Sequence, residues 1–291
     1  MLTREQLKAV RKIQIRTSHL VTDLFAGQYQ SVFKGRGMEF AEVRLYQPGD
    51  DVRTIDWNVT ARTSIPHVKR YAEERELTVM LLIDASRSTV FGSVRQTKSA
   101  LAAELGALLA FSAITNNDKV GLVIFTDRIE LALPPRKGTH HVLRVIREIL
   151  SLRPVGRGTD IPAALEHLGH VTKRRTVVFV VSDFLDPRFR QTLRVASRRH
   201  DVIAVVLEDP REATLPDVGL VELEEAETGA RYVVDTGDRR VREAFARQAA
   251  AARTERDRGL RAADVDAIVV RTDRPYTEPL LRFFRMRGRR Q

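Results

Sequence analysis

Residues 78–88 read TVMLLIDASRS, an apolar run that ends in an acidic residue and two serines. The run does not alternate between apolar and polar residues, so both faces of the strand that it predicts would be buried. Residues 176–184, TVVFVVSDF, repeat this pattern later in the chain. Strands buried on both faces belong to a parallel sheet that helices cover on each side. The two stretches therefore predict an α/β fold.

Strand-like and helix-like patterns alternate on either side of these stretches. Between 217 and 235, two strand-like runs flank a turn at Glu227, Thr228 and Gly229, which predicts an antiparallel hairpin at the sheet edge. We therefore expect residues 77–291 to form a doubly wound, mostly parallel sheet of the Rossmann type with an edge hairpin. The expected strands are 78–84, 120–125, 176–181, 201–207 and 267–270, and the expected helices are 94–114, 140–152, 162–170, 187–199 and 240–261.

The first 76 residues have a different pattern of apolar and polar residues. Apolar residues recur at helical spacing from about residue 4 to about residue 25, and residues 38–47, MEFAEVRLYQ, alternate as a strand does. We expect residues 1–76 to form a small α+β extension, with Trp57 as a packing anchor. Its charged side chains are interpreted first as internal ion pairs that hold the extension to the main domain and second as a docking surface; they are Arg36, Arg44, Asp50, Asp51, Arg53 and Asp56.

Composition limits the chemistry that the chain can perform. The 291 residues correspond to roughly two domains. Lys and Arg number 49 against 38 Asp and Glu, which gives a net charge of +11 and suggests an anionic partner. The absence of cysteine excludes disulfides, thiolate metal sites and cysteine nucleophiles. Any reactive or metal-binding group must therefore be a hydroxyl, a carboxylate or an imidazole.

The sequence carries no export signal. The N-terminal residues are charged throughout, and the most apolar runs are far shorter than the roughly 20 residues of a membrane helix. We therefore expect a cytoplasmic protein.

Three loops carry oxygen side chains at positions where a ligand would bind. In an open α/β sheet, ligands bind outside the carboxyl ends of the strands. The first loop follows the strand at 78–84, the second is GRGTD at 156–160, and the third is SDF at 182–184. Oxygen ligands suit a hard divalent cation such as Mg²⁺ or Mn²⁺. Asp160 is better explained as a helix N-cap than as a ligand, so the candidate metal ligands are Asp84, Ser86, Ser88, Thr159 and Asp183.

These motifs carry a resemblance to a known fold family. The order D-x-S-x-S, G-T-D and S-D resembles the metal-ion-dependent adhesion site of von Willebrand factor A domains. Residues 34–63, KGRGMEFAEVRLYQPGDDVRTIDWNVTART, resemble the signature of the bacterial domain-of-unknown-function 58 family. Residues 209–223, DPREATLPDVGLVEL, and 235–245, DTGDRRVREAF, are similar to later segments of that family.

The resemblance implies a function. In that fold, Ser86 and Ser88 would ligate the metal directly, Thr159 directly or through water, and Asp84 and Asp183 directly or through bound waters. The metal would keep one coordination position open for a partner's Glu or Asp. Members are often encoded beside MoxR-type AAA+ ATPases and are thought to act with them in protein assembly or maturation. We therefore expect a non-enzymatic, metal-dependent protein-interaction module, with its basic charge steering acidic surfaces toward the site.

Two alternatives remain. A Mg²⁺-dependent phosphohydrolase would use Asp84 as its nucleophile, but the general acid such enzymes place two residues later is Ser86 here. No phosphate-binding G-x-x-x-x-G-K-[ST] motif is present either. A nucleic-acid-binding protein would use the C-terminal RFFRMRGRRQ, 282–291, for stacking and phosphate contacts. We favour instead an amphipathic final helix with four residues packing inward, Leu280, Leu281, Phe283 and Phe284.

Overall fold

The computed structural model describes residues 29, 32, 39–72 and 77–290. The predicted helix at about 4–25 and Arg36 lie outside these residues. The chain divides into two compact units: one comprises 78–291 together with 1–32, and the other comprises 33–77.

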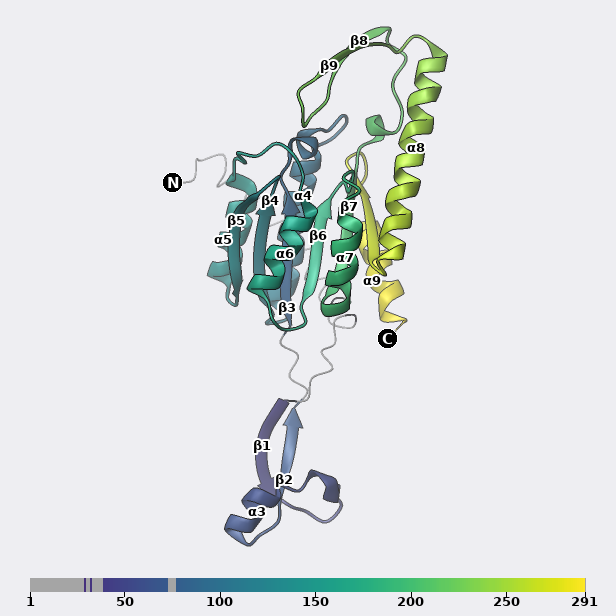
Figure 1. Cartoon of the computed structure of the whole chain (residues 1–291). Coiled ribbons are helices and arrows are strands. Elements are labelled where there is room, and N and C mark those ends of the chain that lie inside the picture. The colour runs from purple at the N-terminus through teal and green to yellow at the C-terminus, as the bar shows by residue number, and fades with distance from the viewer. Residues whose placement is uncertain (1–28, 30–31, 33–38, 73–76, 291) are drawn as a thin grey trace. The chain divides into compact units, whose positions relative to one another are not determined.

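A six-stranded sheet forms the centre of the α/β unit (Figure 1). All neighbouring strands are parallel except β4 and β5, which form an antiparallel pair at one edge. In chain order the arrangement is 6-5-4-1-2-3, the doubly wound order in which the winding direction reverses between the first and fourth strands. The strands are β3 (Thr78–Asp84), β4 (Lys119–Phe125), β5 (Ile129–Arg136), β6 (Val177–Ser182), β7 (Asp201–Glu208) and β10 (Asp266–Arg271).

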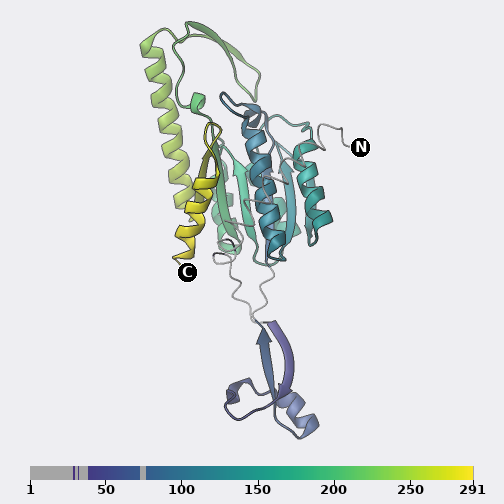
Figure 2. The ribbon, with the colours of Figure 1, turned by 180° about the vertical axis from the view of Figure 1, so that it is seen from behind.

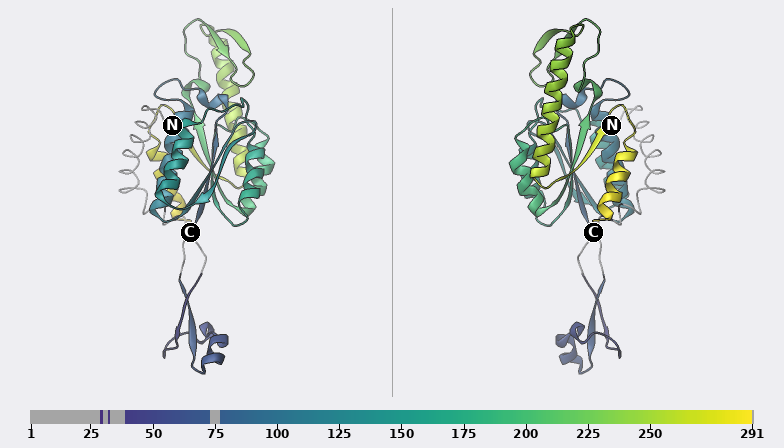
Figure 3. Two further views of the ribbon diagram at one scale, coloured as in Figure 1. Left: turned by 90° about the vertical axis from the view of Figure 1, so that its left-hand side faces the viewer. Right: turned by 90° about the vertical axis from the view of Figure 1, so that its right-hand side faces the viewer.

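Helices cover both faces of this sheet, as its doubly apolar strands require. Figure 2 shows α4, α5 and α9 on one face, and Figure 3 shows the helices on the two sides of the sheet edge-on. The opposite face carries α6, α7 and α8 (Figure 1). The helices are α4 (Lys98–Thr115), α5 (Thr139–Ser151), α6 (Ile161–Val171), α7 (Phe189–Arg199), α8 (Arg239–Ala262) and α9 (Thr277–Gly288).

Helix α4 lies deep in the α/β unit. Among the described residues it is the one helix that is long and apolar enough to cross a membrane, and 67% of its 18 residues are buried inside the protein. Its buried side chains include Leu101, Leu105 and Leu108, with no measurable exposure. They contribute to the core on one face, while Met80 and Leu82 of β3 pack into the core on the other.

The sequence did not predict strand β5. Its residues, IELALPPR, include two prolines, which cannot donate to a sheet ladder and argue against a strand. An edge strand tolerates them because its outer side has no neighbour to accept an N–H group. The edge hairpin of this sheet is therefore β4–β5.

The predicted hairpin at 217–235 forms, but its location in the sheet was wrong. Strands β8 (Leu220–Glu224) and β9 (Arg231–Asp235) pair only with each other and make a separate two-stranded sheet. In Figure 1 this hairpin lies beyond the carboxyl ends of the parallel strands. Its side chains therefore lie near the loops in which the candidate ligands occur.

The 33–77 unit is built on a hairpin of its own. Strands β1 (Glu39–Leu45) and β2 (His67–Ala72) pair antiparallel, and η2 (Val52–Thr54) and α3 (Trp57–Thr63) lie between them in sequence. Within this unit the Arg44 guanidinium donates to both carboxylate oxygens of Asp50 at 2.9 and 2.6 Å, while ion pairs that hold this unit to the α/β unit stay a prediction. Trp57, expected to be a packing anchor, is 67% exposed, so that prediction was wrong.

The C-terminal segment folds as the favoured amphipathic helix. Leu280, Phe283 and Phe284 of α9 are buried and Leu281 is half-buried. Arg287 pairs with Asp201 at the start of β7. The aromatic rings of this segment are therefore used in the core.

Candidate functional site

The candidate ligands gather where the winding direction of the sheet reverses. Strands β3 and β6 are neighbours there, so Asp84 and Asp183 follow adjacent parallel strands. The second loop reaches the first through the Arg87 amide, which donates to the Arg157 carbonyl at 3.0 Å. This edge of a doubly wound sheet is where a ligand is expected, and the structure brings the three predicted loops to it.

Four of the five predicted ligands belong to one hydrogen-bonded chain. Asp84 accepts from the Ser86 amide at 2.9 Å and from the Ser182 hydroxyl at 2.6 Å. The hydroxyls of Ser86 and Ser88 lie 3.1 Å apart, and Ser88 donates to Asp183 at 2.8 Å. Asp84, Ser86 and Asp183 are at most 3% exposed. The chain is therefore a buried row of oxygens, half-buried at Ser88, that crosses from the β3 loop to the β6 loop.

The spacing of these oxygens suits a small divalent cation. Oxygens bound to octahedral Mg²⁺ at about 2.1 Å lie about 3 Å from their neighbours. The Ser86–Ser88 and Ser88–Asp183 separations are 3.1 and 2.8 Å. A cation can therefore replace these hydrogen bonds with little movement of the oxygens.

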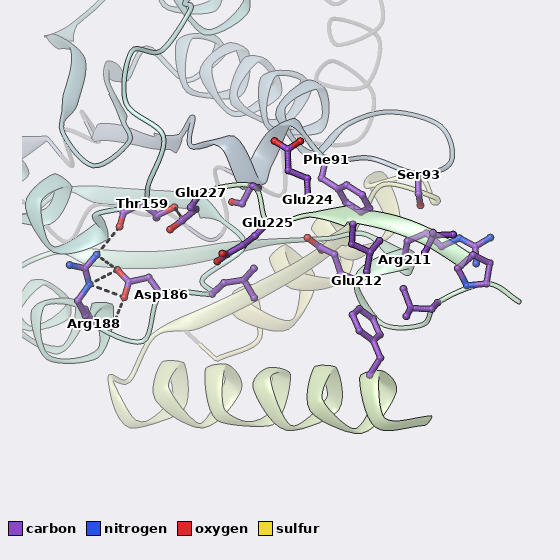
Figure 4. Close-up of a pocket in the computed structure, with 18 residues that line it drawn as sticks. Phe91, Ser93, Thr159, Asp186, Arg188, Arg211, Glu212, Glu224, Glu225 and Glu227 are labelled. Atoms are coloured by element: carbon purple, nitrogen blue, oxygen red, sulfur yellow. Dashed lines mark hydrogen bonds and ion pairs between the residues drawn. The ribbon is translucent and has the colours of Figure 1, made fainter. Parts of the chain in front are cut away.

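Thr159, the fifth predicted ligand, contacts a residue outside the three loops. Its hydroxyl donates to Glu227 in the β8–β9 turn at 3.1 Å. Arg188 fixes the backbone here by donating to the Thr159 carbonyl at 2.9 Å (Figure 4). Thr159 and Ser88 also line the same cavity of about 780 Å³.

A buried lysine that the sequence analysis did not single out lies beside the site. Lys98 begins α4, has no measurable exposure, and donates to Asp183 at 2.8 Å and to Glu212 at 2.5 Å. Burial lowers the pKa of Lys98, but the carboxylates of Asp183 and Glu212 more than offset it, and the pKa lies above its ordinary value. The Lys98 ammonium is therefore a positive charge that the protein itself places beside Asp183 and Glu212.

The single positive charge of Lys98 does not balance the negative charges of the carboxylates in this part of the site. Burial, followed by the nearby Asp183 carboxylate, raises the pKa of Asp84 to about 7. Burial likewise raises the pKa of Glu212. The Lys98 ammonium is shared by Asp183 and Glu212, and a divalent cation would add positive charge beside Asp84 and Asp183. The residues fit the implied metal in donor chemistry and in charge.

A carboxylate from β5 holds the second loop in place. Glu130 accepts from the amides of Val155 and Gly156 at 3.1 and 2.7 Å and from the Thr126 hydroxyl at 2.8 Å. Gly156 approaches so closely that a Cβ there would lie 2.1 Å from the Thr126 hydroxyl oxygen. Glycine is therefore required at this position, three residues before Thr159. As expected, Asp160 caps α6, accepting from the Ala163 amide at 2.9 Å.

Asp209, which follows β7, joins loops at the same end of the sheet. It accepts from the Ser93 hydroxyl and amide, and from the Thr272 hydroxyl after β10. Burial alone would raise the pKa of Asp209, but the hydrogen bonds from Ser93 and Thr272 hold it below its ordinary value. Asp209 is therefore a buried, ionised residue that links the loops around the candidate site.

The charges around the cavity differ from the expectation of a basic surround. Its lining carries two arginines, Arg188 and Arg211, against five carboxylates, Asp186, Glu212, Glu224, Glu225 and Glu227. The apolar part of the lining includes Phe91, Leu185 and Phe245. The cavity lining therefore attracts cations and does not itself supply the expected basic charge, while steering of acidic surfaces toward the site stays a prediction.

Sequence reasoning missed Lys98, Ser182, Glu212 and Glu227 as members of the site. Ser182 was visible in the S-D pattern, and Glu227 in the turn of the hairpin, but no local signal placed that turn at the site. Among the described residues, no group of three or more Asp, Glu or His side chains surrounds one point. Cation binding here would therefore depend on the serine and threonine hydroxyls.

Comparisons with other proteins place this geometry in a family. Residues 42–255 match the family described as "Protein of unknown function DUF58". The uncharacterized protein Rv1480 of Mycobacterium tuberculosis is 35% identical over 286 residues, which cover 97% of this chain and 89% of that protein. The uncharacterized protein YeaD of Bacillus subtilis is 25% identical over 184 residues, covering 63% and 43% of the two chains.

Solved structures are also similar to the chain. BatB from Bacteroides thetaiotaomicron matches with a TM-score of 0.49 and 16% identity, covering 73% of this chain and 99% of that one. A von Willebrand factor type A structure from Catenulispora acidiphila matches with a TM-score of 0.41 and 10% identity, covering 76% and 43%.

Proposed function

The chain belongs to the family described as protein of unknown function DUF58, and we propose that it is a non-enzymatic, divalent-cation-dependent protein-interaction module. The observation that carries the proposal is the buried row of oxygens joining Asp84, Ser86, Ser88 and Asp183 across two adjacent strand ends. Thr159 borders the same cavity as Ser88 and completes the donor set.

The residues divide into two groups by role. Ser86, Ser88 and Thr159 would hold Mg²⁺ or Mn²⁺ through neutral hydroxyls, and Asp84 and Asp183 would hold it directly or through water. Lys98 offsets part of the charge on Asp183, to which it donates at 2.8 Å. A cation held by few net negative charges stays electropositive and attracts an external carboxylate. Metal and partner would then strengthen each other's binding by linkage.

The hydrogen bonding of Asp84 favours this function over a phosphohydrolase. Both carboxylate oxygens of Asp84 accept hydrogen bonds, and the residue is 1% exposed. A carboxylate held in this way would have to break contacts before attacking phosphorus. We therefore propose that Asp84 organises the loop and the cation.

We propose a cytoplasmic partner with an acidic docking residue, either a MoxR-type AAA+ ATPase or the client that such an ATPase remodels. Nucleic acid is the lesser alternative, because the aromatic residues Phe283 and Phe284 that would stack on bases are buried. The partner proposal rests on the family resemblance, and the charge argument above supplies its chemistry.

Capture of the partner tests the proposal. Immobilised full-length protein should retain a MoxR-type ATPase from the same genome in Mg²⁺, and recovery should fall in EDTA. The Ser88→Ala variant should behave in Mg²⁺ as wild type does in EDTA, whereas Ser99→Ala, an exposed serine at the start of α4, should not. Equal recovery with and without chelator would exclude docking through the cation.

A further inference from the structure

The turn of the β8–β9 hairpin contacts two of the three candidate metal-binding loops. Glu227 accepts from the Thr159 hydroxyl at 3.1 Å, and Figure 4 shows the two side chains facing each other at the cavity wall. Glu224, at the end of β8, pairs with Arg87 in the middle of the D-x-S-x-S loop at 3.8 Å. These two contacts hold the hairpin over the site, and both are made to loop residues and not to strands of the six-stranded sheet.

We propose that Glu227 is an internal ligand of the cation, so that metal binding closes the hairpin over its own site. The proposal rests on the proposed function, because it requires a cation held by Ser86, Ser88 and Thr159. A carboxylate is the type of group that the open coordination position of such a site attracts, and this chain places one of its own there.

The distance between Glu227 and Thr159 supports the assignment. Neighbouring oxygens on an octahedral Mg²⁺ lie about 3 Å apart, and the Glu227 carboxylate oxygen lies 3.1 Å from the Thr159 hydroxyl oxygen. If Thr159 ligates the cation, Glu227 is therefore already at the separation of an adjacent ligand. No large movement of the hairpin is needed to bring the carboxylate to the metal.

The basic residue whose charge interacts with that of Glu227, Arg188, is shared with Asp186. Among the residues that the structure describes, Glu227 forms no ion pair, and the nearby Arg188 is already bound to Asp186 at 2.9 Å. The cavity wall adds further carboxylates, including Glu225. A carboxylate directed at a row of hydroxyls, among other carboxylates, gains most from a cation.

The hairpin can move without disturbing the rest of the fold. Strands β8 and β9 pair only with each other, so opening the hairpin breaks no hydrogen bond of the six-stranded sheet. Glu227 holds the position that a partner's acidic residue would take, and it lines the cavity of about 780 Å³. A docking partner must therefore displace Glu227, and the hairpin acts as a gate for the site.

Two measurements with Mn²⁺ as the sole ligand test this inference. Calorimetry should show that Glu227→Gln weakens Mn²⁺ binding about tenfold or more, while Glu222→Gln, an exposed position on the same hairpin, binds as wild type does. Hydrogen exchange of residues 220–235 should slow when Mn²⁺ is added to wild type and to Glu222→Gln. The same segment should show no change in Glu227→Gln.

The outcomes separate the two proposals. If Glu227→Gln binds Mn²⁺ as tightly as wild type and its hairpin is equally protected, Glu227 is not a ligand, and the cation site itself stands. If wild type binds no Mn²⁺, the proposed function fails and the internal ligand fails with it. Weaker binding without any metal-dependent protection of the hairpin would also overturn the gate.

Discussion

Replacing Lys98 with methionine removes the ammonium while keeping most of the apolar side-chain stem. Lys98 is completely buried and its partner Asp183 is 3% exposed, so the change leaves a buried carboxylate without its cation. Breaking a buried ion pair from one side costs about 3–5 kcal/mol. The second partner, Glu212, has a side chain that is 32% exposed and can turn toward water, so it adds little. We expect Lys98→Met to lower the free energy of unfolding by about 3–5 kcal/mol in EDTA.

Divalent cation should reduce this loss. A ligand at one hundred times its dissociation constant stabilises the folded state by about 2.7 kcal/mol. Without the competing ammonium on Asp183, the variant should bind Mg²⁺ more tightly than wild type does. The difference in unfolding free energy between variant and wild type should therefore be smaller in Mg²⁺ than in EDTA.

Urea unfolding followed by circular dichroism measures the effect, because α4 to α9 all lie in the α/β unit. Fluorescence of Trp57, the one tryptophan of the chain, follows the 33–77 unit separately and should not change. Lys173→Met, at an exposed lysine, is the matched control. An unfolding free energy of Lys98→Met within about 1 kcal/mol of wild type in EDTA would refute the buried-charge reasoning, as would a difference that grows in Mg²⁺.

Three further changes have defined outcomes. The pKa of Asp209 lies below its ordinary value, so the stabilisation that its carboxylate provides is present above about pH 4 and is lost as the pH falls through its folded pKa. In urea unfolding, Asp209→Asn should cost about 1–3 kcal/mol at pH 7, and this difference from wild type should shrink as the pH is lowered below about 4. Gly156→Ala should lower the free energy of unfolding by about 1–3 kcal/mol, because the new Cβ crowds Thr126, and it should weaken Mg²⁺ binding in calorimetry. The control Gly169→Ala, which has open space around it in α6, should raise the free energy of unfolding by up to about 1 kcal/mol. Asp160→Ala should lower the thermal midpoint by losing an N-cap worth about 1 kcal/mol, and unchanged melting would contradict the cap.

The sequence predicted those parts of the fold in which local pattern and burial agree. The doubly apolar runs at β3 and β6 identified the parallel sheet, and all five predicted strands and five predicted helices of 77–291 are confirmed with small shifts in their ends. Strand β5 was not predicted, because Pro134 and Pro135 argue against a strand unless it lies at the edge of a sheet. Trp57 was misjudged because an aromatic residue has no local signal that separates a core position from a surface one.

Two of the three loops could be placed because they follow strands, whereas the Thr159 loop precedes α6 and was included only because of the other two. Asp84 and Asp183 could be placed together because parallel strands end at one edge of the sheet. Lys98 and Glu227 could not, because each reaches the site across a contact remote in sequence, to Asp183 and Thr159. Helix periodicity says nothing about a lysine at the first turn that points inward, and the hairpin pattern says nothing about where its turn lies.

The central claim is that Ser86 and Ser88 hold a divalent cation. Calorimetric titration of Mg²⁺ into the metal-free, full-length protein tests it most directly, with the Ser86→Ala/Ser88→Ala double variant and Ser99→Ala as the matched control. We predict one saturable site in wild type and in the control, and none in the double variant, with all three proteins showing the same circular dichroism. Equal Mg²⁺ binding in the double variant, or no binding in wild type, would contradict the claim.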